Sequence, residues 1–83
     1  MTRSKPKRAA ADGRKTDIPA IFGRRLRAAR EKAGLTQAVV AYRAELSQNR
    51  MSPIEGGRTD LRLSTAHKLA RAVGVPLCDL LPK

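Results

Sequence analysis

Apolar side chains recur every three or four residues along most of the chain, and no stretch alternates between apolar and polar residues as a strand would. The first stripe consists of Phe22, Leu26, Ala29 and Ala33. Asp17 or Ile18 can cap this helix, and Gly34 ends it. A later stripe, which ends before a last turn or two over residues 77–81, consists of Leu63, Ala66, Leu69, Ala70 and Val73. The pattern predicts an all-α domain over residues 17–83, a compact bundle of five short helices.

The segment between Gly34 and Glu55 contains two short helical patterns separated by a tight turn. Thr36 can cap the first helix, and Ser47, eleven residues later, can cap the second. Their apolar positions are Ala38, Val40, Ala41, Ala44, Met51 and Ile54. This spacing leaves room for two turns of helix and a corner of about three or four residues. These are the dimensions of a helix-turn-helix, whose second helix enters the major groove of DNA.

Pro53 interrupts the second of these helices. In a helix interior it would remove the hydrogen bond to the Asn49 carbonyl, at a cost of about 3 kcal/mol. The residues from Ser52 to Glu55 also read as a helix start of their own, with a serine cap, a proline and a glutamate. The sequence therefore predicts a second helix that is kinked or split near Ser52 and still presents its first turn to the groove.

The chain is strongly basic, with 18 Lys and Arg against 7 Asp and Glu and a net charge of +11. Because self-repulsion of this size weakens a compact state, the charge points to a polyanionic partner. Nucleic acid is the first candidate and an anionic membrane surface the second. Phe22 and Tyr42 are the only aromatic residues, too few for the stacking platforms that bind single strands. Double-stranded DNA is therefore the expected target.

Residues 1–16 form a basic arm with six Lys and Arg and no large apolar side chain after Met1. Such a composition cannot offset the entropy of ordering, so we expect a disordered arm in the free protein. Arms of this kind lie along phosphates or in a minor groove. The alternative interpretation is a solubilising extension with no contact role.

Several classes of protein are excluded by what the chain lacks. Cys78 is the only cysteine, so an intramolecular disulfide is impossible and a reducing cytosol fits best. No segment has the apolar length of a secretory signal or a membrane span. His67 is the only histidine, and one Cys and one His cannot make a zinc site. We expect a cytoplasmic protein, at the nucleoid when it is bound to DNA, that is not an enzyme and needs no cofactor or metal.

Taken together, these residues resemble the lambda-repressor-like, or Cro/C1-type (XRE), DNA-binding domain over roughly residues 20–81. The matching pieces are Phe22-Gly23-x-Arg25-Leu26-Arg27-x-x-Arg30, Gly34-Leu35-Thr36-Gln37, Val40-Ala41, Leu46-Ser47, Ile54-Glu55-x-Gly57-Arg58, Leu63 and Lys68-Leu69-Ala70-x-Ala72-Val73-Gly74-Val75. One departure is Glu45, which stands where members of the family usually have a glycine with a positive φ. Glutamate there costs on the order of 1 kcal/mol.

The resemblance implies roles for particular side chains. Gln37, at the start of a helix, contacts a DNA phosphate in the family. Arg30 and Glu55 would pair and lock the second helix of the motif against the first helix of the domain, which orients it more than it stabilises the fold.

Geometry adds the base-reading positions, because the first turn of the recognition helix points into the groove. Gln48, Asn49 and Arg50 are the candidates, with Ser52 behind them, since Gln and Asn can pair with adenine and Arg with guanine. Further phosphate candidates, which would position the domain without reading sequence, are Arg43, Ser47, Arg58 and Arg62.

The resemblance also implies a homodimer. The last segment of the chain carries more apolar surface than one small core can use, namely Val75, Leu77, Leu80 and Leu81. A two-fold dimer would present its recognition helices about 34 Å apart to a near-palindromic operator. The expected function is a sequence-specific transcriptional regulator, autoregulatory in the manner of restriction-modification controllers or phage repressors.

Two other functions remain open at this stage. The chain could be an antitoxin-type module whose main task is to cover a protein partner, with the arm as a binding segment. It could also be a nucleoid-type protein that binds DNA through charge alone. The dependence of affinity on salt, compared between specific and random duplexes, separates these functions from a sequence-specific regulator.

Overall fold

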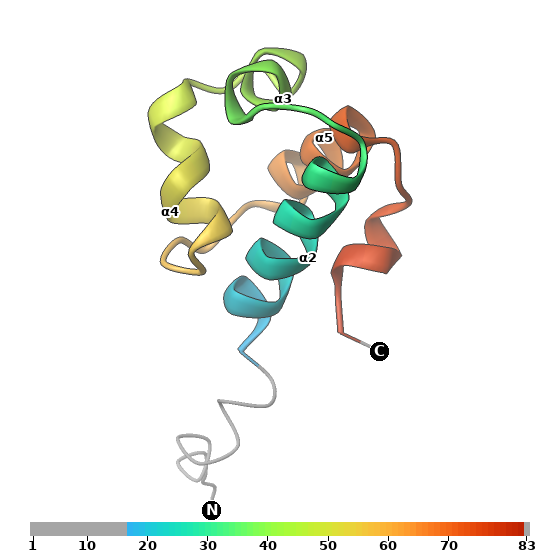
Figure 1. Ribbon diagram of the computed structural model, residues 1–83. Coiled ribbons are helices and arrows are strands. Elements are labelled where there is room, and N and C mark those ends of the chain that lie inside the picture. The colour runs from blue at the N-terminus through green and yellow to red at the C-terminus, as the bar shows by residue number, and fades with distance from the viewer. Residues whose placement is uncertain (1–16, 83) are drawn as a thin grey trace, which may run out of the picture.

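A computed structural model describes residues 17–82, and the expected arm (residues 1–16) and residue 83 lie outside this range. The elements, labelled as in Figure 1, are α2 (Ile18–Lys32), α3 (Gln37–Arg43), η1 (Gln48–Arg50), α4 (Met51–Glu55), α5 (Leu63–Val73) and η2 (Leu77–Leu80), where η marks a 3-10 helix. Residues 17–82 contain no strand, so the all-α prediction is confirmed. The expected five helices are replaced by four α-helices and two 3-10 helices.

The ends of α2 follow from local chemistry. The Asp17 side chain accepts a hydrogen bond of 3.2 Å from the Ala20 amide and thereby caps the helix, and Pro19 lies in the first turn. At the other end Gly34 has a φ of 73°, a conformation that glycine adopts without strain. The predicted stripe is buried at Phe22 and Leu26, whereas Ala33 lies beyond the helix end and is exposed.

Every helix of residues 17–82 except η1 supplies at least one side chain to a single core. The largest fully buried side chains are Leu26, Val40, Met51, Ile54, Leu69 and Leu80. Because α2, α3, α4, α5 and η2 each contribute, none of them can bury its apolar face without the others. The core therefore fixes the position of the helix-turn-helix segment relative to α2 and α5.

Two leucines are not where the sequence pattern put them. Leu63 was expected inside, but it is the first residue of α5 and is 74% exposed. Leu80 was expected at a dimer interface, but it is 2% exposed because η2 packs against α2 and α5. Leu80 is thus a core residue and offers no surface to a partner.

The split expected near Ser52 takes the form of a change in helix type between Arg50 and Met51, where a 3-10 helix runs into an α-helix without a gap. Residues Gln48–Arg50 form the 3-10 helix η1, and α4 begins at Met51. Pro53 consequently lies in the first turn of α4, where the backbone amide would have no acceptor within the helix. The expected cost of about 3 kcal/mol for an interior proline therefore does not apply.

The crossing of α2 and α4 depends on Gly23. A Cβ at this position would overlap the Ile54 carbonyl oxygen and lie 2.7 Å from the Glu55 carbonyl oxygen. Only a residue without a side chain lets the two backbones approach this closely. Gly23 therefore sets the distance at which the recognition segment lies against α2, beside it in Figure 1.

Candidate nucleic-acid interface

The residues expected to read bases occupy the 3-10 helix η1 and the first turn of α4, which follows it directly. Gln48, Asn49 and Arg50 form η1, Ser52 is the second residue of α4, and all four are exposed. Ser47 stands at the cap position of η1, but its side chain makes no capping hydrogen bond, contrary to expectation. The segment thus presents a run of solvated polar side chains, on an element whose neighbours Met51 and Ile54 are buried.

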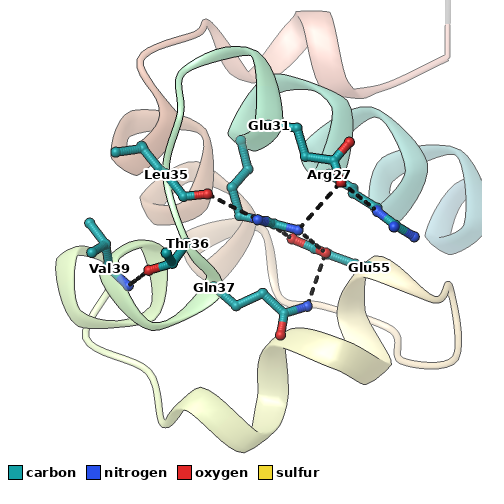
Figure 2. A network of polar contacts seen from close by, with 8 residues as sticks. Arg27, Glu31, Leu35, Thr36, Gln37, Val39 and Glu55 are labelled. Carbon is teal, nitrogen blue, oxygen red and sulfur yellow. Dashed lines mark hydrogen bonds and ion pairs between the residues drawn. The ribbon is translucent and has the colours of Figure 1, made fainter.

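The carboxylate of Glu55 joins α4 to two other helices (Figure 2). Arg30 of α2 donates to both of its oxygens, from Nε at 2.7 Å and from Nη2 at 3.1 Å. Gln37 of α3 donates from Nε2 to Oε1 at 3.1 Å, and Arg30 also donates from Nη1 to the Leu35 carbonyl oxygen at 2.9 Å. One carboxylate and one guanidinium therefore connect α2, the α2–α3 loop, α3 and α4.

This ion pair is largely shielded from water. The side chains of Arg30 and Glu55 are only 13% and 5% exposed. The hydrogen bonds to Glu55 raise the pKa of Arg30 above its already high usual value, so the guanidinium stays charged. Bidentate arginine–carboxylate geometry restricts direction as well as distance. The pair expected from the resemblance is thus present in a geometry suited to orienting α4.

Local features define the start of α3 and the corner that follows it. Thr36 Oγ1 accepts a hydrogen bond of 3.2 Å from the Val39 amide and caps α3 (Figure 2). Glu45 has a φ of 61°, which is the positive value expected for the turn position. Its carboxylate lies 3.2 Å from Lys68 Nζ, an exposed pair that links the corner to α5.

The candidate phosphate residues do not all lie together. Gln37 and Arg58 line a polar hollow between α2, α3 and α4 that also contains Ser52. Arg62 is exposed just before α5. Arg43 lies elsewhere, since its Nη1 donates to the Ala72 carbonyl oxygen near the end of α5 at 3.1 Å.

Sequence reasoning missed Arg27, which lines the same hollow as Gln37 and Arg58. The signal was available, because Arg27 precedes Arg30 by three residues and so shares its face of α2. Arg27 Nε lies 3.1 Å from Glu31 Oε2 in an exposed ion pair, and the same oxygen is 4.0 Å from Arg30 Nη2 (Figure 2).

Residues 17–82 lack two further kinds of functional feature. None of their helices has the length and apolarity needed to cross a membrane. Within the same range, no group of His, Cys, Asp and Glu side chains has the geometry of a metal site.

Known proteins resemble this chain in sequence and in fold. A family model of the helix-turn-helix domain matches residues 21–81. Two solved structures share 31% identity with the chain. The restriction-modification controller protein C.AhdI from Aeromonas hydrophila has a TM-score of 0.71 over 75% of this chain and 94% of its own. The hypothetical transcription factor NHTF from Neisseria has a TM-score of 0.73 over 80% of this chain and 75% of its own.

The hydroxypropylphosphonic acid epoxidase from S. wedmorenis contains the same fold in 36% of its chain, at 20% identity and a TM-score of 0.73, and that likeness concerns the fold alone. No curated protein matches the chain. The family match covers most of residues 17–82, and the two helices, the corner between them and the exposed first turn of the second helix are those of the motif. The chain therefore belongs to the helix-turn-helix family of DNA-binding transcription regulators and has the fold of its Cro/C1-type members.

Proposed function

We propose that this protein is a sequence-specific transcriptional regulator that binds double-stranded DNA as a homodimer on a near-palindromic operator. The observation that carries the proposal is the contrast between the exposed Gln48–Arg50 turn and the buried Arg30–Glu55 pair behind it. Base recognition needs flexible polar groups on a rigidly placed element, because a shift of about 1 Å misaligns their hydrogen bonds.

Base contacts in this proposal come from η1 and the start of α4. Gln48 and Asn49 can each make two hydrogen bonds to adenine, and Arg50 can make two to guanine. Ser52, the second residue of α4, is the fourth base-contacting residue and lies behind these three in the chain. The tighter 3-10 turn changes the angular spacing of these side chains relative to an α-helix, from about 100° to about 120° per residue.

Phosphate contacts position the domain on the duplex. Gln37 donates one amide hydrogen to Glu55 and keeps the second for a phosphate oxygen. Ser47, Arg58 and Arg62 are exposed and free to reach the backbone. Arg43 would have to give up or share its hydrogen bond to Ala72. These contacts supply affinity and salt dependence without reading sequence.

The dimer surface that we propose is smaller than the one expected from the sequence. Val75, Leu77 and Leu81 remain partly exposed, whereas Leu80 is removed from this set because it is buried. Leu81 also lines an apolar hollow of about 210 Å³, together with Ile18 and the protruding Leu63. In an interface with two-fold symmetry both copies use the same surface. Leu63 of each copy could therefore enter the apolar hollow of the other copy.

A charge in this hollow tests the dimer directly. We expect Leu63→Glu to convert a dimer into a monomer in sedimentation equilibrium, because the carboxylate would be buried against an apolar surface. Val39→Glu is the matched control, since Val39 is an exposed apolar residue on α3. Equal masses for the two variants would contradict the proposed surface.

The similarity to the restriction-modification controller protein C.AhdI supports a small regulator of this kind. An autoregulatory role, in which the protein binds upstream of its own gene, is part of the proposal. It predicts that a reporter under that upstream region changes its output when the protein is supplied from a second promoter.

Selection from a random pool of duplexes tests the proposed function as a whole. The purified protein is incubated with random 30-base-pair duplexes at physiological salt, and the bound fraction is amplified and sequenced. We expect enrichment of an imperfect palindrome whose half-sites lie about one helical turn apart. A pool that stays random after repeated rounds would contradict sequence-specific binding.

A further inference from the structure

The polar hollow between α2, α3 and α4 has a composition suited to an anion. It measures about 340 Å³, and two exposed arginines line it, Arg27 from α2 and Arg58 from the loop that follows α4. Gln37 of α3 lines it as well. The hollow is therefore lined by two exposed guanidinium groups and an amide, which come from three different segments of the chain.

The charges of the hollow are only partly compensated. Arg30 and Glu55 neutralise one another in the shielded pair. Arg27 has a partner in Glu31, but both side chains are more than half exposed, at 63% and 56%. The backbone amide of Arg58 donates to the Pro53 carbonyl oxygen, but its guanidinium makes no hydrogen bond or ion pair with any other residue of the range 17–82. An anion in the hollow would meet one unpaired guanidinium and one that is weakly paired.

We propose that this hollow takes a phosphate of the DNA backbone, which Arg27 and Arg58 hold together, and that Glu31 competes with the phosphate for Arg27. The inference rests on the proposed function and adds Arg27 to the DNA-contacting residues. The planar guanidinium presents two N–H groups side by side and can bond to two phosphate oxygens at once, which suits a phosphate better than a single ammonium does. Because the hollow also contains Ser52, a phosphate held there would fix the depth at which η1 enters the groove.

Exchange of partners at Arg27 is easy in this geometry. Exposed ion pairs between residues i and i+4 contribute little stability, so a phosphate can displace Glu31. Glu31 is not left alone when this happens, since its Oε2 already lies 4.0 Å from Arg30 Nη2. Glu31 thus lowers the affinity of the protein for DNA, because a phosphate must displace it from Arg27, and the fold does not need this ion pair.

Two variants with matched controls test the inference on a duplex enriched by the wild-type protein, in fluorescence-anisotropy titrations over a series of salt concentrations. Arg27→Ala is compared with Arg24→Ala, which removes the same charge from an exposed position of α2 outside the hollow. Glu31→Gln is compared with Glu45→Gln, which removes an exposed carboxylate that pairs with Lys68 on α5.

The two variants are expected to change DNA binding in opposite directions. Arg27→Ala lowers the steepness of log affinity against log salt by about 0.9 per bound subunit, the loss of one phosphate contact, and Arg24→Ala does not. Glu31→Gln raises the affinity more than Glu45→Gln does. If Arg27 and Glu31 served only as a structural ion pair, both variants would weaken binding together, and that result would overturn the inference.

Equal salt dependence for Arg27→Ala and Arg24→Ala would also overturn the inference, but it would leave the proposed function intact because the enriched duplex is still bound. A failure of the proposed function is distinct, since it would be seen earlier, as a selection that enriches no duplex. That outcome would remove the basis of this inference as well.

Discussion

The guanidinium of Arg30 in α2 and the carboxylate of Glu55 in α4 share two hydrogen bonds, of 2.7 and 3.1 Å, although the residues are 25 positions apart in the chain. Glu55 ends α4, the helix whose preceding turn carries the candidate base-reading residues. The pair therefore connects the recognition segment to the longest helix of residues 17–82. Gln37 donates to the same carboxylate, so a phosphate bound at Gln37 would act directly on the position of α4.

Removal of one partner of this pair should be costly. Arg30→Ala leaves the 5% exposed Glu55 carboxylate without its main partner, so we expect a loss of about 3 kcal/mol in the free energy of unfolding. The double variant Arg30→Ala/Glu55→Ala should be more stable than the sum of the single effects predicts. Urea denaturation measures all three variants. Lys32→Ala is the control on the same helix, and equal losses for Arg30→Ala and Lys32→Ala would contradict the role of the pair.

Gly23 should be less replaceable than Gly34, although only Gly34 has a positive φ. Alanine at position 34 meets no atom within 4 Å and costs about 1 kcal/mol in backbone strain. Alanine at position 23 collides with backbone atoms of Ile54 and Glu55, which cannot rotate away. We expect Gly23→Ala to cost about 2–3 kcal/mol and to displace α4. Thermal unfolding followed by circular dichroism would show this difference, and similar melting temperatures for the two variants would refute it.

Glu45 offers a stabilising substitution. Glycine would relieve the strain of a φ of 61° but would lose the exposed pair with Lys68, so we expect Glu45→Gly to gain about 0.5–1 kcal/mol. Glu45→Ala removes the same ion pair and keeps the strain, and it should be neutral or slightly destabilising. Chemical denaturation of the two variants separates the contributions. A loss of stability in Glu45→Gly would mean that the Lys68 pair outweighs the strain.

Arg50 and Arg62 should differ in what they contribute to binding. Loss of the Arg50 guanidinium should cost about 1–3 kcal/mol on the preferred duplex and relax the preference at one base pair. Arg62→Ala should weaken binding to preferred and scrambled duplexes alike and lower the salt dependence by about 0.9 per subunit. Binding isotherms on single-base variants of the duplex check both statements. A uniform loss for Arg50→Ala would place Arg50 on the backbone instead of the bases.

Local chemistry made several features predictable from the sequence. The Asp17 cap, the end of α2 at Gly34 and the change of helix type before Pro53 each depend on residues a few positions apart. The positive φ at Glu45 and the Arg30–Glu55 pair followed from the family pattern, because a motif fixes distant positions relative to one another.

The errors lie at element ends and in short helices. Leu63 begins α5, and the first residue of a helix has too few neighbours in the pattern to assign its face. Leu80 was assigned to a dimer interface because the last segment has more apolar residues than a small core was expected to use, and only the packing of η2 against α2 and α5 makes Leu80 part of that core. The hollow around Arg27 needs α2, α3 and α4 in their final places, which no local pattern supplies.

The central claim is that an exposed first turn on a locked helix reads base sequence. The measurement that tests it is the affinity of the purified wild-type protein for its enriched duplex and for a scrambled duplex of the same composition, over a series of salt concentrations. We predict that the enriched duplex is bound about a thousandfold more tightly at physiological salt. We also predict that the two affinities converge as salt is lowered, because phosphate contacts then dominate. Coincident curves across the whole series would contradict the claim and leave a protein that binds DNA through charge alone.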